Sequence, residues 1–98
     1  MLIKIHKAYR DVVAVCDSEL PGKHFEEGIK QLDIRENFYK GEEKSADELI
    51  ELLKDLAMED STFNIVGKNS VQAALKANII SKEGIKTIQG IPFALVLL

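Results

Sequence analysis

The sequence predicts one small α+β domain with an N-terminal β-hairpin, a mixed sheet, two main helices and a strand–helix–strand unit in the C-terminal half. Three observations predict this class. Alternating or β-branched segments stand near both ends, one strongly amphipathic helical segment lies in the middle, and a second helical segment separates two strand-like runs. With 98 residues, 46% of them hydrophobic, the chain suffices for one core, so we expect a single domain over residues 1–98.

Two strand-like segments around a polar loop indicate the N-terminal hairpin. Residues 1–7 alternate between apolar and polar side chains, and residues 12–17 are mostly apolar and β-branched. The connecting loop is "KAYRD". A hairpin closed near Lys7 and Val12 places Cys16 opposite Ile3 and away from His6.

The next segment reads as turns and short strands. Pro21-Gly22 is a turn signal, and residues 24–34 predict two short strands about Gly28. Residues 36–43 read as a loop, in which we expect Phe38-Tyr39 to cover an edge of the core.

The helix over residues 45–59 has the clearest pattern. Ser45 followed by Glu48 is a capping box, in which each side chain satisfies a backbone donor of the other residue. Charged residues occupy one side of the helix and apolar residues the other. The apolar stripe consists of Ala46, Leu49, Ile50, Leu53, Leu56 and Ala57.

The C-terminal half predicts a strand over residues 61–66, a helix over residues 68–78 ended by Asn78, and one or two strands over residues 84–98. This order implies a right-handed crossover between parallel strands. Residues 93–98, "FALVLL", are apolar throughout, as expected of a strand covered on both faces. We expect neighbouring strands of the same chain to cover this run, with a homodimer as the alternative.

Composition excludes several classes of protein. A single Cys rules out an internal disulfide, and no Cys or His spacing suggests a metal site or a cofactor. The absence of a signal-like start and of an apolar run of 18 residues leads us to expect a cytoplasmic protein that does not span a membrane. The net charge of −3 is concentrated in residues 17–59, with 13 acids and 6 bases, which argues against strong DNA binding.

Four fragments stand in a fixed order along the chain: "AVCDSELPGKHF" at residues 14–25, "FY" followed by Gly41, "NIVG" at residues 64–67 with Val71 and Ala74 after it, and "IQGIP" at residues 88–92. Together they resemble an uncharacterised archaeal family, domain-of-unknown-function family 424. The resemblance implies a small cytoplasmic archaeal protein and supplies no activity, cofactor or catalytic residue. Its pattern has His after the last Pro, where this chain has Phe93.

The first candidate site is an anion site at the start of the second helix, formed by Gly67, Lys68, Asn69 and Ser70. Backbone amides at a helix start bind anions, and Lys68 adds a positive charge. A nucleoside-triphosphate loop is excluded, because Thr62 stands where its first glycine belongs and Asn69 where its Ser or Thr belongs. The alternative is structural: Gly67 forms a tight turn, Asn69 caps the helix, and Lys68 is solvated.

The second candidate is the polar loop that contains Asp17, Glu19, Lys23 and His24. Asp17 and His24 have the chemistry of a base and its orienting partner. Alternatively, Asp17 or Ser18 caps the turn before Pro21 and the other charges face water. Cys16 is the one thiol nucleophile available, and we expect it to be buried and inert.

The third candidate is a nucleic-acid surface around the first hairpin. It combines basic and aromatic character in Lys4, His6, Lys7, Tyr9 and Arg10. Single-stranded RNA is bound by aromatic side chains on a strand face beside a basic groove, and a solvated rim is the plain alternative.

Taken together, the residues favour a non-enzymatic binding module for RNA or a ribonucleoprotein. The alternative is a protein, even an enzyme, that binds an anionic small molecule at Gly67–Asn69.

Overall fold

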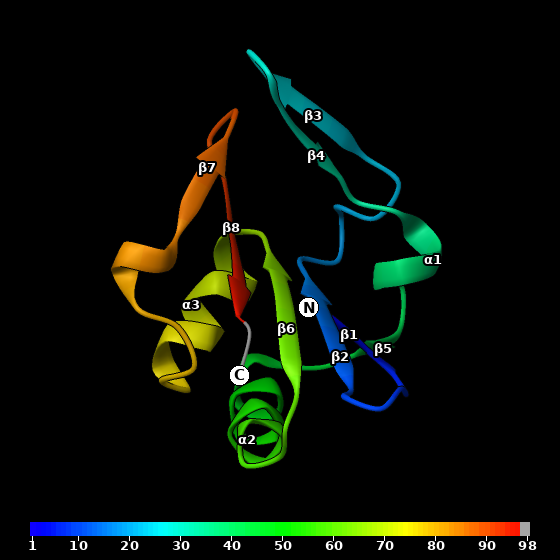
Figure 1. The fold of residues 1–98 in the computed structure, drawn as a ribbon, viewed down its shortest axis with the longest axis vertical. Helices are drawn as coiled ribbons and strands as arrows, with labels where there is room; N and C mark the ends of the chain where they lie inside the picture. The colour runs from blue at the N-terminus through cyan, green and yellow to red at the C-terminus, as the bar shows by residue number, and fades with distance from the viewer. Residues whose placement is uncertain (97–98) are drawn as a thin grey trace.

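The computed structural model describes residues 1–96, which form a six-stranded mixed sheet with helices on both faces and a separate two-stranded hairpin (Figure 1). The sheet order is β5-β1-β2-β6-β8-β7. Its strands are β1 (Leu2–His6), β2 (Val12–Cys16), β5 (Glu42–Glu43), β6 (Thr62–Val66), β7 (Lys86–Ile88) and β8 (Ile91–Val96). The hairpin consists of β3 (His24–Glu27) and β4 (Lys30–Asp33). The helices are α1 (Glu36–Tyr39), α2 (Ala46–Ala57), α3 (Lys68–Lys76) and the 3-10 turn η1 (Lys82–Gly84).

The predicted N-terminal hairpin is present, with a register one residue away from the expected one. Cys16 pairs with Leu2, and Ile3 pairs with Val15. The reason is that the strands close at His6 and Val12, one residue earlier on β1 than expected. Strand β2 then runs parallel to β6, with Cys16 beside Val66, and this parallel pair forms the centre of the sheet.

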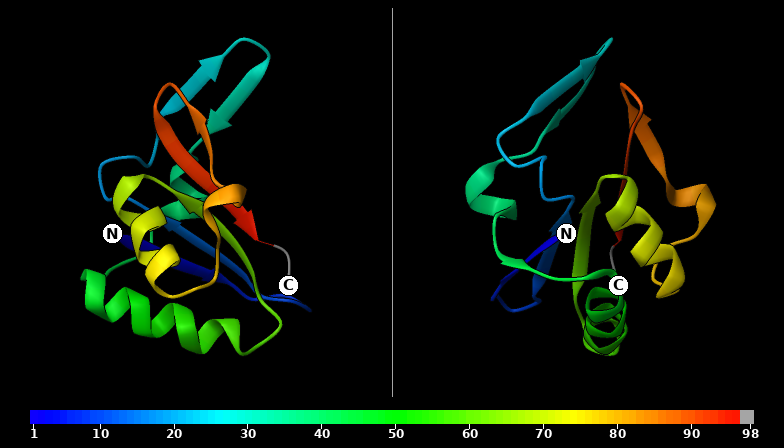
Figure 2. Two further views of the ribbon diagram at one scale, coloured as in Figure 1. Left: turned by 90° about the vertical axis from the view of Figure 1, so that its left-hand side faces the viewer. Right: turned by 180° about the vertical axis from the view of Figure 1, so that it is seen from behind.

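Helices α2 and α3 cover one face of the sheet (Figure 2). The predicted capping box is confirmed: the Glu48 amide donates to Ser45 Oγ, and the Ser45 amide donates to the Glu48 carboxylate. Leu49, Leu53 and Leu56 are buried against the sheet, whereas Ala46 is exposed because it lies in the first, solvated turn. Just past α3, Asn78 adopts a φ of 60°, the left-handed conformation that commonly ends helices.

The opposite face is covered by the segment between β2 and β5. Helix α1 replaces the expected loop, and Tyr39 is buried there, so Phe38-Tyr39 covers the core edge as predicted. The two short strands about Gly28 are confirmed as a projecting arm, β3–β4. Phe25 and Leu32 of the arm pack against a second core cluster that includes Cys16, Ile34 and Tyr39.

The predicted crossover between parallel strands is present in direction but does not join neighbours: β6 and β7 both run antiparallel to β8 and are therefore parallel to each other, and β8 lies between them. Strand β8 runs antiparallel to β6, because the chain first forms β7 and then reverses in a two-residue hairpin. Gln89 and Gly90 both have positive φ, 50° and 77°, which is the pattern of the tight turn whose twist suits a hairpin. The Gln89 amide donates to Glu27 Oε1, and its side chain donates to the Glu26 carbonyl, so this turn also braces the arm beside it.

The apolar C-terminal run lies within the sheet, as expected, but one of its faces is open. Strand β8 sits between β6 and β7, while Leu95 is 60% exposed. The expectation of two covered faces is therefore wrong for this strand, because the cover on the α1 side ends before Leu95. Residues 97–98 of the predicted run lie outside the described residues.

Candidate nucleic-acid interface

The polar loop and the predicted anion site meet at Asp17. This residue follows β2 directly and is 4% exposed. Its carboxylate accepts hydrogen bonds from the Asn69 amide at 3.2 Å, the Ser70 amide at 2.8 Å and Ser70 Oγ at 2.8 Å. The chain's own carboxylate thus caps the N-terminus of α3, where negative charge is favoured.

Gly67 makes this contact sterically possible. It has a φ of 108°, and a Cβ atom there would lie 2.4 Å from Asp17 Cγ. The expectation that the amides of Asn69 and Ser70 are free is thereby corrected, because Asp17 accepts from both. The expectation that Asn69 caps the helix is corrected as well: Gly67 is the N-cap residue, and the capping oxygen comes from Asp17. Lys68 is exposed beside this cap.

The remaining polar-loop residues do not join Asp17. Glu19 and Lys23 are exposed. His24 lies on the arm, where its Nε2 is 3.1 Å from Glu26 Oε1 and its Nδ1 is 3.9 Å from Asp33 Oδ1. Asp17 and His24 therefore have different partners, and no base-and-partner pair is assembled between them.

Cys16 is buried in the second core cluster, as expected. Burial raises the pKa of its thiol to about 12, and the neighbouring Asp17 carboxylate adds to the rise. A neutral thiol is a poor nucleophile and a poor metal ligand. In residues 1–96, no group of three His, Cys, Asp or Glu side chains is placed to hold a metal ion.

The basic and aromatic residues of the first hairpin divide into two groups. Lys4 and His6 lie on the face covered by α1: Lys4 Nζ donates to the Asn37 carbonyl at 2.6 Å, and His6 Nε2 is 2.8 Å from the Phe38 carbonyl. The other residues lie in the loop after β1. Lys7 forms an ion pair with Asp11, Arg10 is exposed, and the Tyr9 side chain is fully solvent-exposed.

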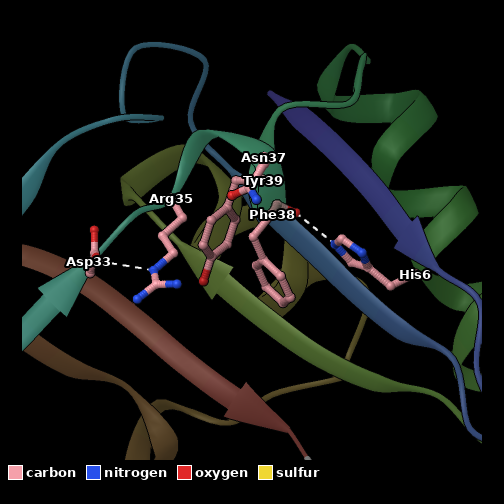
Figure 3. A pocket seen from close by; sticks show the side chains of 6 residues that line it. All are labelled: His6, Asp33, Arg35, Asn37, Phe38 and Tyr39. Atoms are coloured by element: carbon pink, nitrogen blue, oxygen red, sulfur yellow. Dashed lines mark hydrogen bonds and ion pairs between the residues drawn. The ribbon is translucent and has the colours of Figure 1, made fainter.

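A surface hollow of about 320 Å³ connects His6 with α1. It is lined by His6, Asp33, Arg35, Asn37, Phe38 and Tyr39. Figure 3 shows His6 entering from β1 on one side and Arg35 from the segment after β4 on the other, with the rings of Phe38 and Tyr39 between them. The His6 and Phe38 rings are stacked, with centroids 4.5 Å apart, and Phe38 meets Tyr39 edge-on at 5.0 Å.

A partly exposed strip of the same sheet face continues from this hollow; we call it the open strip and define it as His6, Asn64, Phe93 and Leu95. The pairings Asn64–Leu95 and Val66–Phe93 place these side chains on the α1 face, since directly paired residues point the same way. Lys86 pairs with Phe93 and adds a positive charge to that face. Together with Lys86, the open strip therefore combines aromatic, apolar and basic groups.

Sequence reasoning found His6 and missed that Arg35 and Phe38 line the hollow with it, and that Phe93 and Lys86 share its sheet face. The alternation of β8 carries a signal that Phe93 and Leu95 share a face. Their placement on the same face as His6 depends on the antiparallel pairing of β8 with β6, which the expectation of a parallel neighbour concealed.

The fragments that carried the family resemblance lie at close contacts of the fold. Asp17 and Gly67 touch each other, and a Cβ atom on Gly41 would lie 2.1 Å from the Ile3 carbonyl oxygen. Phe93, which follows the last Pro of these fragments, is partly buried on the open strip.

The fold is shared with a crystal structure of an uncharacterized conserved protein from Methanopyrus kandleri. The match has a TM-score of 0.84 at 22% sequence identity and covers 98% of this chain and 90% of that chain. No curated protein matches the sequence. No helix in residues 1–96 has the length and apolar character needed to cross a membrane. Residues 6–98 match the family described as protein of unknown function (DUF424), and the chain belongs to this family.

Proposed function

We propose that this protein is a non-enzymatic module that binds single-stranded RNA on the α1 face of its sheet. The observation that carries the proposal is the open strip, where His6 and Phe93 share one sheet face with Lys86, beside the hollow that contains Arg35 and Phe38. Unpaired bases stack on aromatic side chains exposed on a sheet, and neighbouring cations contact the phosphates.

The few cations around this face support a ligand that is bound through a small number of phosphate contacts. The cations placed on or beside this face are Lys4, Lys86 and Arg35, and Asp33 of the acidic segment 17–59 lines the same hollow. Arg35 is paired with Asp33 at 3.2 Å, so part of the positive charge is compensated. Stacking therefore has to supply much of the affinity, which suits single strands better than duplexes.

The reactive groups of the chain support binding rather than catalysis. The Cys16 thiol is buried with a raised pKa, the Asp17 carboxylate is committed to capping α3, and His6 holds the carbonyl of Phe38. The same engagement of Asp17 weighs against the anion site at Gly67–Asn69, because an incoming anion would have to displace a carboxylate of this chain from two of its amides.

The test is fluorescence anisotropy with a labelled ten-nucleotide RNA of mixed sequence at increasing salt concentration. We expect saturable binding that weakens moderately with salt, because few cations contact the phosphates. Lys86→Ala should lower the slope of log affinity against log salt by about 0.7, the contribution of one phosphate contact to a single strand. Tyr9→Ala should weaken binding without affecting the fold if the RNA continues past His6, because its side chain is fully exposed.

Lys76→Ala is the matched control. Lys76 is exposed on α3, which covers the opposite face of the sheet, so its removal changes the net charge equally and should leave the salt slope unchanged. Absence of saturable binding at low salt would overturn the proposal. Equal losses of RNA affinity from Lys76→Ala and Lys86→Ala would also overturn it, because they would indicate non-specific electrostatic attraction.

A further inference from the structure

We infer that the hollow between His6 and Arg35 binds one nucleobase extruded from the RNA. This inference rests on the proposed function and names the part of the ligand that the hollow accepts. It begins from size: about 320 Å³ lies at the lower end of the range of ligand pockets, which suits a single planar ring system.

The lining favours a planar, polar and uncharged ligand. Phe38, His6 and Tyr39 supply aromatic surface, so a flat ring system is preferred over a branched aliphatic group. The charges of Arg35 and Asp33 compensate each other at 3.2 Å, so the hollow holds no strongly favourable place for an isolated phosphate or ammonium group. A nucleobase meets all of these conditions.

The hydrogen-bonding groups of the hollow match a base edge. A carbonyl oxygen only accepts, so the contact of His6 with the Phe38 carbonyl places a proton on Nε2. In the neutral ring, Nδ1 is then an acceptor. Asn37 adds a side-chain amide that both donates and accepts. The Arg35 guanidinium uses Nε to donate to Asp33, and its two terminal nitrogens carry further N–H donors.

The geometry also holds these groups in place before a ligand arrives. Phe38 is fixed between His6 and Tyr39, and Tyr39 is 7% exposed in the second core cluster. Lys4 donates to the Asn37 carbonyl, which ties α1 to β1 beside the hollow. A preformed site loses less conformational entropy on binding than a mobile one.

The experiment is an NMR titration of the ¹⁵N-labelled protein with AMP, GMP, CMP and UMP in turn, and with ribose 5-phosphate as the probe that lacks a base. We expect at least one nucleotide to shift the amide resonances of His6 and residues 35–39 saturably, with ribose 5-phosphate leaving them in place. Asn37→Ala removes only the side-chain amide. It should lower the affinity for that nucleotide by about two- to tenfold, the effect of one hydrogen bond.

Gln31→Ala is the matched control, because it removes an exposed amide from β4 outside the hollow. Equal shifts from ribose 5-phosphate, or an undiminished affinity of Asn37→Ala, would overturn the base-binding inference. The anisotropy assay with the intact oligonucleotide, run on the wild type and on Asn37→Ala, separates this failure from that of the proposed function. If the RNA binds saturably while no mononucleotide shifts His6 and residues 35–39, RNA binding stands and the base pocket falls; if no RNA binds, both fall.

Discussion

At the scale of single residues, Asp17 and Gly67 depend on each other. The carboxylate reaches three donors of α3 only because no Cβ stands on Gly67. Two effects oppose a side chain at Gly67: the close approach of Asp17 and the positive φ of 108°. The two effects can be separated, because only the first disappears when Asp17 is shortened.

A double-mutant cycle tests this dependence by chemical denaturation. Gly67→Ala should lower the free energy of unfolding by about 2–5 kcal/mol, from backbone strain and overpacking. Asp17→Ala should lower it by about 2–4 kcal/mol, because it removes a helix cap and leaves the buried donors of Ser70 unsatisfied. In the double variant the clash is absent, so its loss should fall short of the sum by at least about 0.5 kcal/mol. Additive losses would show that the carboxylate and the glycine do not constrain each other.

The sequence identified each partner separately and could not join them. Gly67 was predicted as a turn and Asp17 as the end of a strand, but they lie far apart in the chain. They meet because β2 and β6 are parallel neighbours, with Cys16 beside Val66, so the residues after each strand emerge at one edge of the sheet. The pairing of strands is set by tertiary packing, and no local pattern encodes it.

At the scale of elements, α2 was the most predictable part of the fold because its signals are local. The capping box, the apolar stripe and the acidic first turn all lie within one segment. The β7–β8 hairpin was less predictable, because glutamine rarely adopts the positive φ that Gln89 has in its turn. The sequence leaves one or two strands open over residues 84–98, and without the reversal the last strand is expected to run parallel to β6, which conceals the open strip.

The capping box makes a prediction about acid stability. The hydrogen bonds between the Glu48 carboxylate and Ser45 lower the pKa of Glu48 below its ordinary value of 4.5. A lowered pKa means that the ionised carboxylate stabilises the folded state above pH 4.5, and that this stabilisation is lost as the pH falls through the folded-state pKa.

Glu48→Gln tests this, because glutamine retains a capping oxygen and does not titrate. We expect the wild type to be more stable than the variant near neutral pH and the difference to shrink as the pH falls below about 4.5. Urea denaturation at pH 7, 5, 4 and 3 measures it. Glu51→Gln, an exposed position in the middle of α2, serves as the control. A difference that stays constant over this range would mean that Glu48 is not ionised in the cap.

At the scale of the whole molecule, the sheet has two unlike faces. Helices α2 and α3 cover one face completely enough to bury Phe63 and Ile65, whereas the α1 side leaves the open strip partly exposed. This asymmetry follows from length: α2 spans 12 residues, while α1 has only 4. The proposed ligand and the alternative partner, a second copy of the chain, would both use the less covered face.

Two adjacent residues of β8 lie on opposite faces of the sheet, so substitutions at them test the burial of each face separately. Ala94 is 5% exposed, on the side of α2 and α3, and Leu95 is 60% exposed on the open strip. Ala94→Asp should lower the free energy of unfolding by more than about 3 kcal/mol, because it places an unpaired charge in the core. Leu95→Asp adds the same charge at a solvated position and should change stability by less than about 0.5 kcal/mol in a monomer.

The same pair decides whether a second copy covers the open strip. If a homodimer buried Leu95, the carboxylate of Leu95→Asp would be repelled by its counterpart across the two-fold axis, and sedimentation would show dissociation together with a lower melting temperature. We expect the protein to sediment as a monomer before and after this substitution, because the proposed RNA surface must stay accessible. A dimeric wild type that Leu95→Asp converts to monomers would assign the open strip to self-association instead.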